Sequence, residues 1–90
     1  MTHPNPDLIE HRFKEALEAY IATGRHPGGF LNAILCNDLM EAVARADESA
    51  LDNLPHIVSW LYNEVPISCW GSPERVKYWL QHMETLTSNP

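Results

Sequence analysis

The sequence predicts an all-α fold: a compact, single-domain bundle of about four helices that takes up residues 1–90. Apolar residues recur every three or four positions along most of the chain, as on one face of an amphipathic helix. Nowhere do β-branched residues alternate over the length of a strand. The length of 90 residues favours one core, because so short a chain cannot bury enough surface for two.

The first predicted helix begins at Asn5-Pro6-Asp7 and ends at Gly24. Asn5 can cap the helix, Pro6 has the preset φ angle of a first helical residue, and Asp7 suits the positive helix end. Gly24 favours the left-handed conformation that closes many helices. The apolar positions expected to face the core are Ile9, Phe13, Ala16, Leu17, Tyr20 and Ile21.

The second predicted helix starts at about Gly29 and extends to about Ala46. We expect it to be continuous or mildly bent, because neither glycine nor proline separates its halves. The alternative is that Asn37 and Asp38 cap a new helix, so that the second helix is kinked or split. The residues expected to face the core are Phe30, Leu31, Ile34, Leu35, Leu39, Met40 and Val43.

The third predicted helix begins near Asn53 and Pro55 and stops before Pro66, since the residue before a proline avoids the helical conformation. Its apolar residues are Leu54, Ile57, Val58 and Leu61, with Trp60 beside them.

The fourth predicted helix opens at Ser72-Pro73-Glu74, where the serine can cap the helix and the proline suits its first position. We expect the two ends of the chain, residues 1–5 and 87–90, to fray. The inward positions of this helix are Val76, Trp79, Leu80, Met83 and Leu86.

Acidic residues gather in the middle of the chain, which has a net charge of −6. From Asp38 to Glu64 there are six acidic residues against one base, Arg45. Such a surface repels phosphate backbones, so nucleic-acid binding is not expected. Two interpretations stay open: a solvated face that keeps the protein soluble, or a contact surface for a basic partner. The acidic candidates for partner contact are Glu41, Asp47, Glu48 and Asp52.

Five aromatic residues lie within a short stretch near the C-terminus, more than one helix pair buries easily. Partly exposed aromatic rings are common anchors of protein interfaces. The competing interpretation is an aromatic core in which Trp70 closes one end of the bundle. The aromatic candidates for partner contact are Trp60, Tyr62, Trp70 and Tyr78.

A glycine-rich turn precedes the second helix and contains Arg25, His26, Gly28 and Gly29. Backbone N–H groups of such a turn can bind an anion, and the basic pair would add positive charge. The turn lacks the Lys-Ser/Thr pair of a P-loop, however, and no predicted strand precedes it. The structural interpretation is that Gly28 and Gly29 permit a sharp turn and close packing of the first two helices.

No catalytic or metal-binding motif can be recognised in the chain. The histidines lack Glu-x-x-His and His-x-x-x-His spacings, and Cys36 and Cys69 lack a Cys-x-x-Cys spacing and are expected to be buried thiols. We therefore expect neither enzyme activity, nor a metal, nor a cofactor. The apolar runs fall far short of the roughly 20 residues that cross a bilayer, and the N-terminus lacks a signal sequence, which predicts a cytoplasmic protein.

Two blocks of the sequence resemble a group of small, uncharacterised proteins encoded in bacteriophages and prophages. The blocks read HPGGFLNAILCNDLMEAVARAD and IVSWLYNEVPISCWGSPERVKYW, and the resemblance covers about residues 20 to 79. It implies a phage setting inside a bacterial host and transfers no functional residue.

The sequence therefore predicts a non-enzymatic accessory protein of phage type that acts by protein–protein interaction, for example by blocking a host protein, including a defence protein. The alternative is a module that binds a nucleotide or another small ligand at the turn from Arg25 to Gly29. A homodimer is a further expectation, because a small domain with extra aromatic residues gains stability by pairing.

Overall fold

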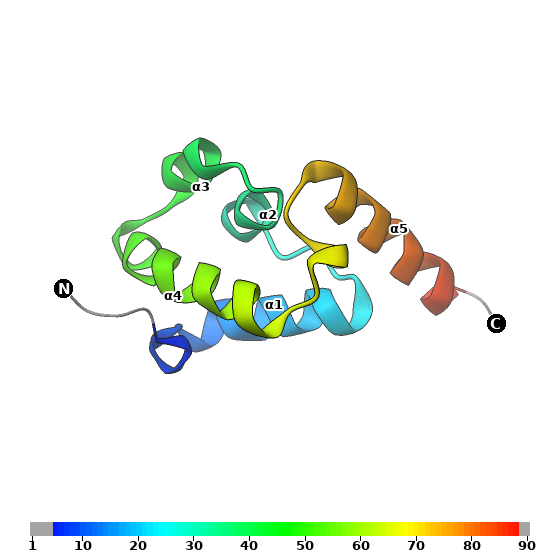
Figure 1. Ribbon diagram of the computed structural model, residues 1–90, viewed down its shortest axis with the longest axis horizontal. Helices are drawn as coiled ribbons and strands as arrows, with labels where there is room; N and C mark the ends of the chain where they lie inside the picture. The colour runs from blue at the N-terminus through cyan, green and yellow to red at the C-terminus, as the bar shows by residue number, and fades with distance from the viewer. Residues whose placement is uncertain (1–4, 89–90) are drawn as a thin grey trace.

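A computed structural model describes residues 5–88, which contain helices and no strand (Figure 1). The all-α fold class is confirmed, whereas a four-helix bundle is not, since the described part of the chain forms five α-helices and two short 3-10 helices. In order, the elements are η1 (Pro6–Leu8), α1 (His11–Thr23), α2 (Gly29–Leu35), α3 (Leu39–Arg45), α4 (Glu48–Glu64), η2 (Ile67–Cys69) and α5 (Pro73–Ser88).

The first predicted helix is divided into η1 and α1. The side-chain Oδ1 of Asn5 accepts the N–H of Asp7 at 3.0 Å, so the predicted cap starts the 3-10 turn and not the α-helix. The predicted end at Gly24 is confirmed: this residue has a φ of 72°, and its N–H donates to the carbonyl of Tyr20 at 2.8 Å.

The expected continuous second helix is wrong, and the split alternative is what the structure contains. Asn37 has a φ of 62°, a left-handed conformation that breaks the helix between α2 and α3. The carboxylate of Asp38 then accepts the N–H of Glu41 at 3.2 Å and caps α3. Because α3 starts in a new direction, its apolar residues do not have to point to the same side of the molecule as those of α2.

The start predicted for the third helix at Asn53 and Pro55 is also wrong. The helix, α4, begins earlier, where the Asp47 carboxylate accepts the N–H of Ala50 at 2.8 Å. Pro55 does not start the helix but lies inside α4. The helix tolerates the loss of the backbone hydrogen bond that a proline cannot donate. The predicted end before Pro66 is confirmed, since α4 stops at Glu64.

The start of α5 agrees with the sequence pattern. The Ser72 hydroxyl oxygen accepts the N–H of Arg75 at 3.2 Å, and Val76 is buried. The helix extends to Ser88, and of the termini predicted to fray, residues 1–4 and 89–90 lie outside the described residues, as does the side chain of Leu86.

One apolar core unites the helices, and the radius of gyration of 13.0 Å is close to the roughly 12 Å of a compact chain of this length. The side chains of Leu17, Leu35, Ile57 and Leu61 are completely buried. Of the two thiols predicted to be buried, Cys69 is, whereas Cys36 is only half-buried. In Figure 1, α2 lies between α3 and α5 along the long axis, and α1 and α4 run below α3 and α2.

Candidate interaction surface

An exposed apolar face extends over α3 and α4. On α3, Leu39 is 64% exposed and Val43 is 45% exposed, and on α4, Leu51 is 43% exposed and Val58 is 41% exposed. Met40, at 84%, points furthest into solvent. The prediction that Leu39, Met40 and Val43 face the core is therefore wrong, because the split before α3 leaves only Ala42 of this helix buried.

A shallow cleft runs along this face where the start of α3 meets the middle of α4. Its walls include Leu39 on one side and Leu54 and Val58 on the other, and the buried residues Ile34 and Ala42 contribute to its floor. One helical turn away from these walls lie Val43 and Leu51, since residues three or four apart share a helix face. We define the α3/α4 face as Leu39, Val43, Leu51, Leu54 and Val58.

The acidic candidates differ in whether their charge is already used within the protein. Glu41 forms an ion pair with Arg45 one turn later on α3. Glu48 and Asp52 are exposed, and no residue in the described part of the chain forms an ion pair with either of them. On α4, Glu48 precedes Leu51 by three residues, and Asp52 directly follows Leu51 and lies one turn after Glu48, so the two carboxylates lie along one side of the stripe on α4.

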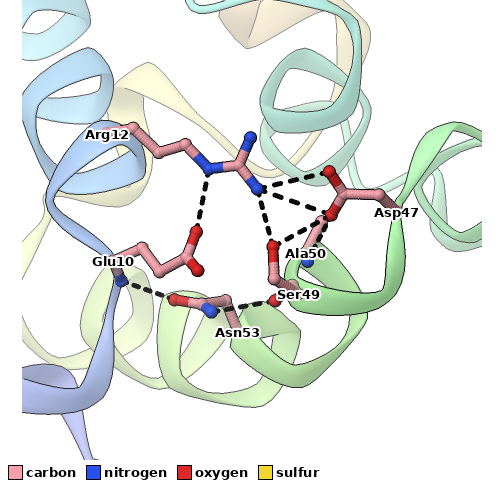
Figure 2. A network of polar contacts seen from close by, with 6 residues as sticks. All are labelled: Glu10, Arg12, Asp47, Ser49, Ala50 and Asn53. Atoms are coloured by element: carbon pink, nitrogen blue, oxygen red, sulfur yellow. Dashed lines mark hydrogen bonds and ion pairs between the residues drawn. The ribbon is translucent and has the colours of Figure 1, made fainter.

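Asp47, the fourth acidic candidate, belongs to a network that joins the starts of α1 and α4 (Figure 2). The Arg12 guanidinium donates to Glu10 at 2.8 Å, to Asp47 at 3.3 Å and to Ser49 at 2.7 Å. The N–H of Ala50, the hydroxyl of Ser49 and the Arg12 guanidinium together lower the pKa of Asp47, and the Ala50 bond contributes most. Asp47 thus has a structural role that leaves less of its charge for a partner.

Asn53 completes this network from inside the fold, as its sticks in Figure 2 show. Its side chain is 5% exposed, accepts the N–H of Glu10 at 2.6 Å and donates to the carbonyl of Ser49 at 2.9 Å. Both polar ends of this buried amide are therefore satisfied, and Asn53 anchors the chain ahead of α1 to the first turns of α4.

The aromatic candidates divide into packed and exposed rings. Trp60 and Trp70 are partly buried against the core, and the indole N–H of Trp70 donates to the carbonyl of Val65 at 3.2 Å. Tyr62 is 79% exposed and lies one turn beyond Val58, where it extends the α3/α4 face. Tyr78 is 59% exposed but lies on α5, at the far end of the molecule from α3 (Figure 1).

The glycine-rich turn borders an open pocket of about 500 Å³ lined by Arg25, His26 and Gly28. The pocket wall also contains Glu15, and the Arg12 guanidinium beside it is already bound to carboxylates. Little unbalanced positive charge therefore remains for an anion.

The two glycines of this turn differ in their backbone. Gly28 has a φ of 97°, and its N–H donates to Nδ1 of His26 at 3.1 Å. Gly29 has the ordinary backbone of a first helical residue. Only Gly28 is required by the backbone of the turn, and the nearest group to a Cβ on Gly29 would be the Arg45 side chain.

Other kinds of site receive little support from the described residues. No cluster of three or more His, Cys, Asp or Glu side chains with metal-binding geometry occurs among them. Burial raises the pKa of the Cys36 and Cys69 thiols, which disfavours the nucleophilic thiolate. Within residues 5–88, every helix is too short or too polar to cross a bilayer.

Comparison of the chain with protein-family models, curated proteins and solved structures finds no match.

The apolar half of this surface is what the sequence pattern failed to indicate. Leu51 lies ahead of Asn53, the predicted start of the third helix, although Leu51, Leu54, Val58 and Tyr62 follow one another at intervals of three, four and four residues. Asp47, in the position of a cap for a helix that contains all four, is the signal that could have revealed the stripe.

Proposed function

We propose that the protein is a non-enzymatic interaction module that binds another protein through the α3/α4 face. The observation that carries this proposal is the exposure of apolar side chains along two neighbouring helices beside carboxylates that are not ion-paired within the described residues. Continuous apolar surface on a small protein commonly marks a contact site, whereas scattered apolar residues do not.

The physical reason is the free energy that burial of these side chains would release. An aliphatic side chain of this size stabilises a fold or a complex by about 1.5–3 kcal/mol when it moves from water to a fully buried site. Leu39, Val43, Leu51 and Val58 are each more than 40% exposed, so a partner that covers them recovers part of this free energy.

The resemblance of the two sequence blocks to phage-encoded proteins supports a more specific form of the proposal. A small acidic protein of this kind would act in the cytoplasm of a bacterial host by binding and blocking a host protein, for instance one involved in defence. Nothing in the fold names that protein, so the phage setting is part of the proposal.

The experiment is affinity capture from host lysate with the wild-type chain and two variants. Leu39→Asn with Val58→Thr removes apolar surface from the α3/α4 face, and Ile67→Thr removes it from η2, where Ile67 is 54% exposed. The double variant should lose the captured protein while Ile67→Thr keeps it. Equal capture by all three chains, with their folds shown intact by circular dichroism, would contradict the proposal.

A second candidate function, binding of a phosphate-bearing ligand, depends on the pocket beside Arg25 and His26, and the carboxylate of Glu15 in the same wall weighs against it. A melting-temperature screen with inorganic phosphate and ATP tests it. A shift that is lost in Arg25→Ala would support this function, and the absence of any shift would count against it.

A further inference from the structure

We propose that the partner segment that binds the α3/α4 face is an amphipathic α-helix with an apolar stripe flanked by Lys or Arg. This inference rests on the proposed function and narrows the class of partner. The shape of the apolar cleft, the length of the stripe on α4 and the unpaired charges beside it favour such a partner.

The cleft has the form of a site for one aliphatic side chain from a helix. Leu39 stands on the α3 side, Leu54 and Val58 stand on the α4 side, and the cleft is closed below by Ile34 and Ala42, which are 6% and 1% exposed. A side chain inserted here contacts apolar atoms on two sides at once. Helix-in-groove recognition uses such a central anchor, together with neighbours three and four residues away on the same helix.

The stripe on α4 is long enough for several turns of a second helix. From Leu51 to Tyr62 it spans about 16 Å at the rise of an α-helix, which corresponds to about three turns. Val43 on α3 lies one turn beyond Leu39 and widens this face. A helix laid along it can place three apolar residues of one stripe against the protein.

The charges beside the stripe favour a basic partner. The exposed carboxylates of Glu48 and Asp52 form no ion pair within residues 5–88, and Asp38, whose carboxylate caps α3, is one of the residues that line the cleft. The cation nearest along α3, Arg45, is already paired with Glu41. Lys or Arg residues that flank an apolar stripe would therefore meet uncompensated negative charge, which accelerates association and selects the partner.

The same charges disfavour a second copy of this chain as the occupant. In a two-fold dimer the α3/α4 face meets a second copy of itself, so the interface contains two copies of Glu48 and Asp52. No free base on the α3/α4 face would balance these charges. A basic helix from another protein avoids this repulsion.

The test uses three fluorescein-labelled peptides of about 18 residues, a length at which a helix can form on binding. The first has Leu at alternating intervals of three and four residues, so that one face of its helix is apolar, and Lys at all other positions. The second has Glu in place of Lys, and the third has the composition of the first in scrambled order. Fluorescence anisotropy measures the affinity of each for the full chain, and amide chemical shifts locate the contact.

The first peptide should bind best and shift the amides of α3 and α4. Leu39→Asn with Val58→Thr should weaken it about tenfold or more, because each lost apolar contact removes part of the burial free energy. Glu48→Gln with Asp52→Asn should weaken it less and should also reduce its salt dependence. The matched control Glu18→Gln with Glu74→Gln changes two exposed acids on α1 and α5 and should leave binding unchanged.

Four results would overturn the inference. Equal affinity for the Lys and Glu peptides would show that binding does not require basic residues in the partner. Equal affinity for the Lys peptide and its scrambled form would show that binding does not require an apolar stripe. Light scattering that gives a dimer, with the α3 and α4 amides protected from exchange, would make a second copy the occupant. If the Lys peptide fails while Leu39→Asn with Val58→Thr still loses host-protein capture, the proposed function stands and only this inference is wrong.

Discussion

The indole N–H of Trp79 donates a hydrogen bond of 2.9 Å to the carbonyl oxygen of Tyr20, which joins α5 to the last turn of α1. The same oxygen accepts the N–H of Gly24 at the end of α1, and the hydroxyl of Tyr20 donates to the carbonyl of Cys69 at 2.7 Å. A single buried tyrosine thus connects α1 to both η2 and α5. These contacts hold the C-terminal part of the molecule in place while leaving α3 and α4 outside this network.

Removal of the Tyr20 hydroxyl should therefore destabilise the whole domain. Tyr20→Phe leaves the Cys69 carbonyl without this donor in a buried position, and we expect a loss of about 1–2 kcal/mol in the free energy of unfolding. Urea denaturation followed by circular dichroism measures it. Tyr62→Phe is the matched control, because Tyr62 is 79% exposed and should change the stability by less than about 0.5 kcal/mol.

The carboxylate of Asp47 should make stability depend on pH in the acidic range. The N–H of Ala50, followed by Ser49 and Arg12, lowers the pKa of Asp47 in the folded state. A lowered folded-state pKa stabilises the fold above the unfolded-state pKa, and this contribution is lost as the pH falls through the folded-state pKa.

Asp47→Asn should thus be less stable than wild type at neutral pH, and the difference should close in acid. Thermal unfolding at a series of pH values from neutral down to about 2 follows it. Asp52→Asn is the control, since Asp52 has no ion pair in the described part of the chain. An equally large difference at every pH would contradict the assigned role of the Asp47 carboxylate.

Gly24 is required both for its backbone and for its lack of a side chain. Its φ of 72° costs an alanine about 1–2 kcal/mol, and a Cβ at this position would overlap the side chain of Met83 on α5. Gly24→Ala should therefore lower the free energy of unfolding by at least about 2 kcal/mol. Gly29→Ala is the control: its backbone is helical and its Cβ would meet only the exposed Arg45 side chain, so a change within about 0.5 kcal/mol is expected.

Pro55 weakens α4, so its replacement should stabilise the protein. A proline inside a helix leaves the carbonyl four residues earlier, that of Leu51, without an N–H partner. Pro55→Ala restores that bond and should raise the free energy of unfolding by about 1–3 kcal/mol. Pro66→Ala, outside the helix, should bring no such gain. If Pro55→Ala were destabilising, packing of the proline ring would outweigh the missing bond.

Several helix ends could be predicted because each depends on groups within one turn. Gly24 ends α1, Ser72 starts α5, and α4 stops ahead of Pro66, as the local rules require. The break at Asn37-Asp38 and the position of Pro55 were not resolved in this way. In both, a local signal competes with the continuation of a helix, and the outcome depends on how the helices pack.

The candidate site was predictable in part. Its exposed carboxylates, Glu48 and Asp52, were among the residues expected from charge alone. Charge alone also indicates Asp47, but its position beside Arg12, 35 residues away along the chain, gives it a structural role that no local pattern reveals. The exposure of the apolar residues on the α3/α4 face could not be predicted. Helical periodicity identifies an apolar stripe but does not tell whether another element of the fold buries it.

For this protein, the sequence alone determined the helical class, several of the helix termini and the acidic character of the middle of the chain, since these depend on residue type and short-range spacing. Only the tertiary structure decided that Leu39, Val43 and Val58 stay exposed while Ala42 and Ile57 are buried. The physical reason is that α3 leaves α2 at the left-handed Asn37 and therefore presents its leucine and valine beside the stripe of α4, outside the core.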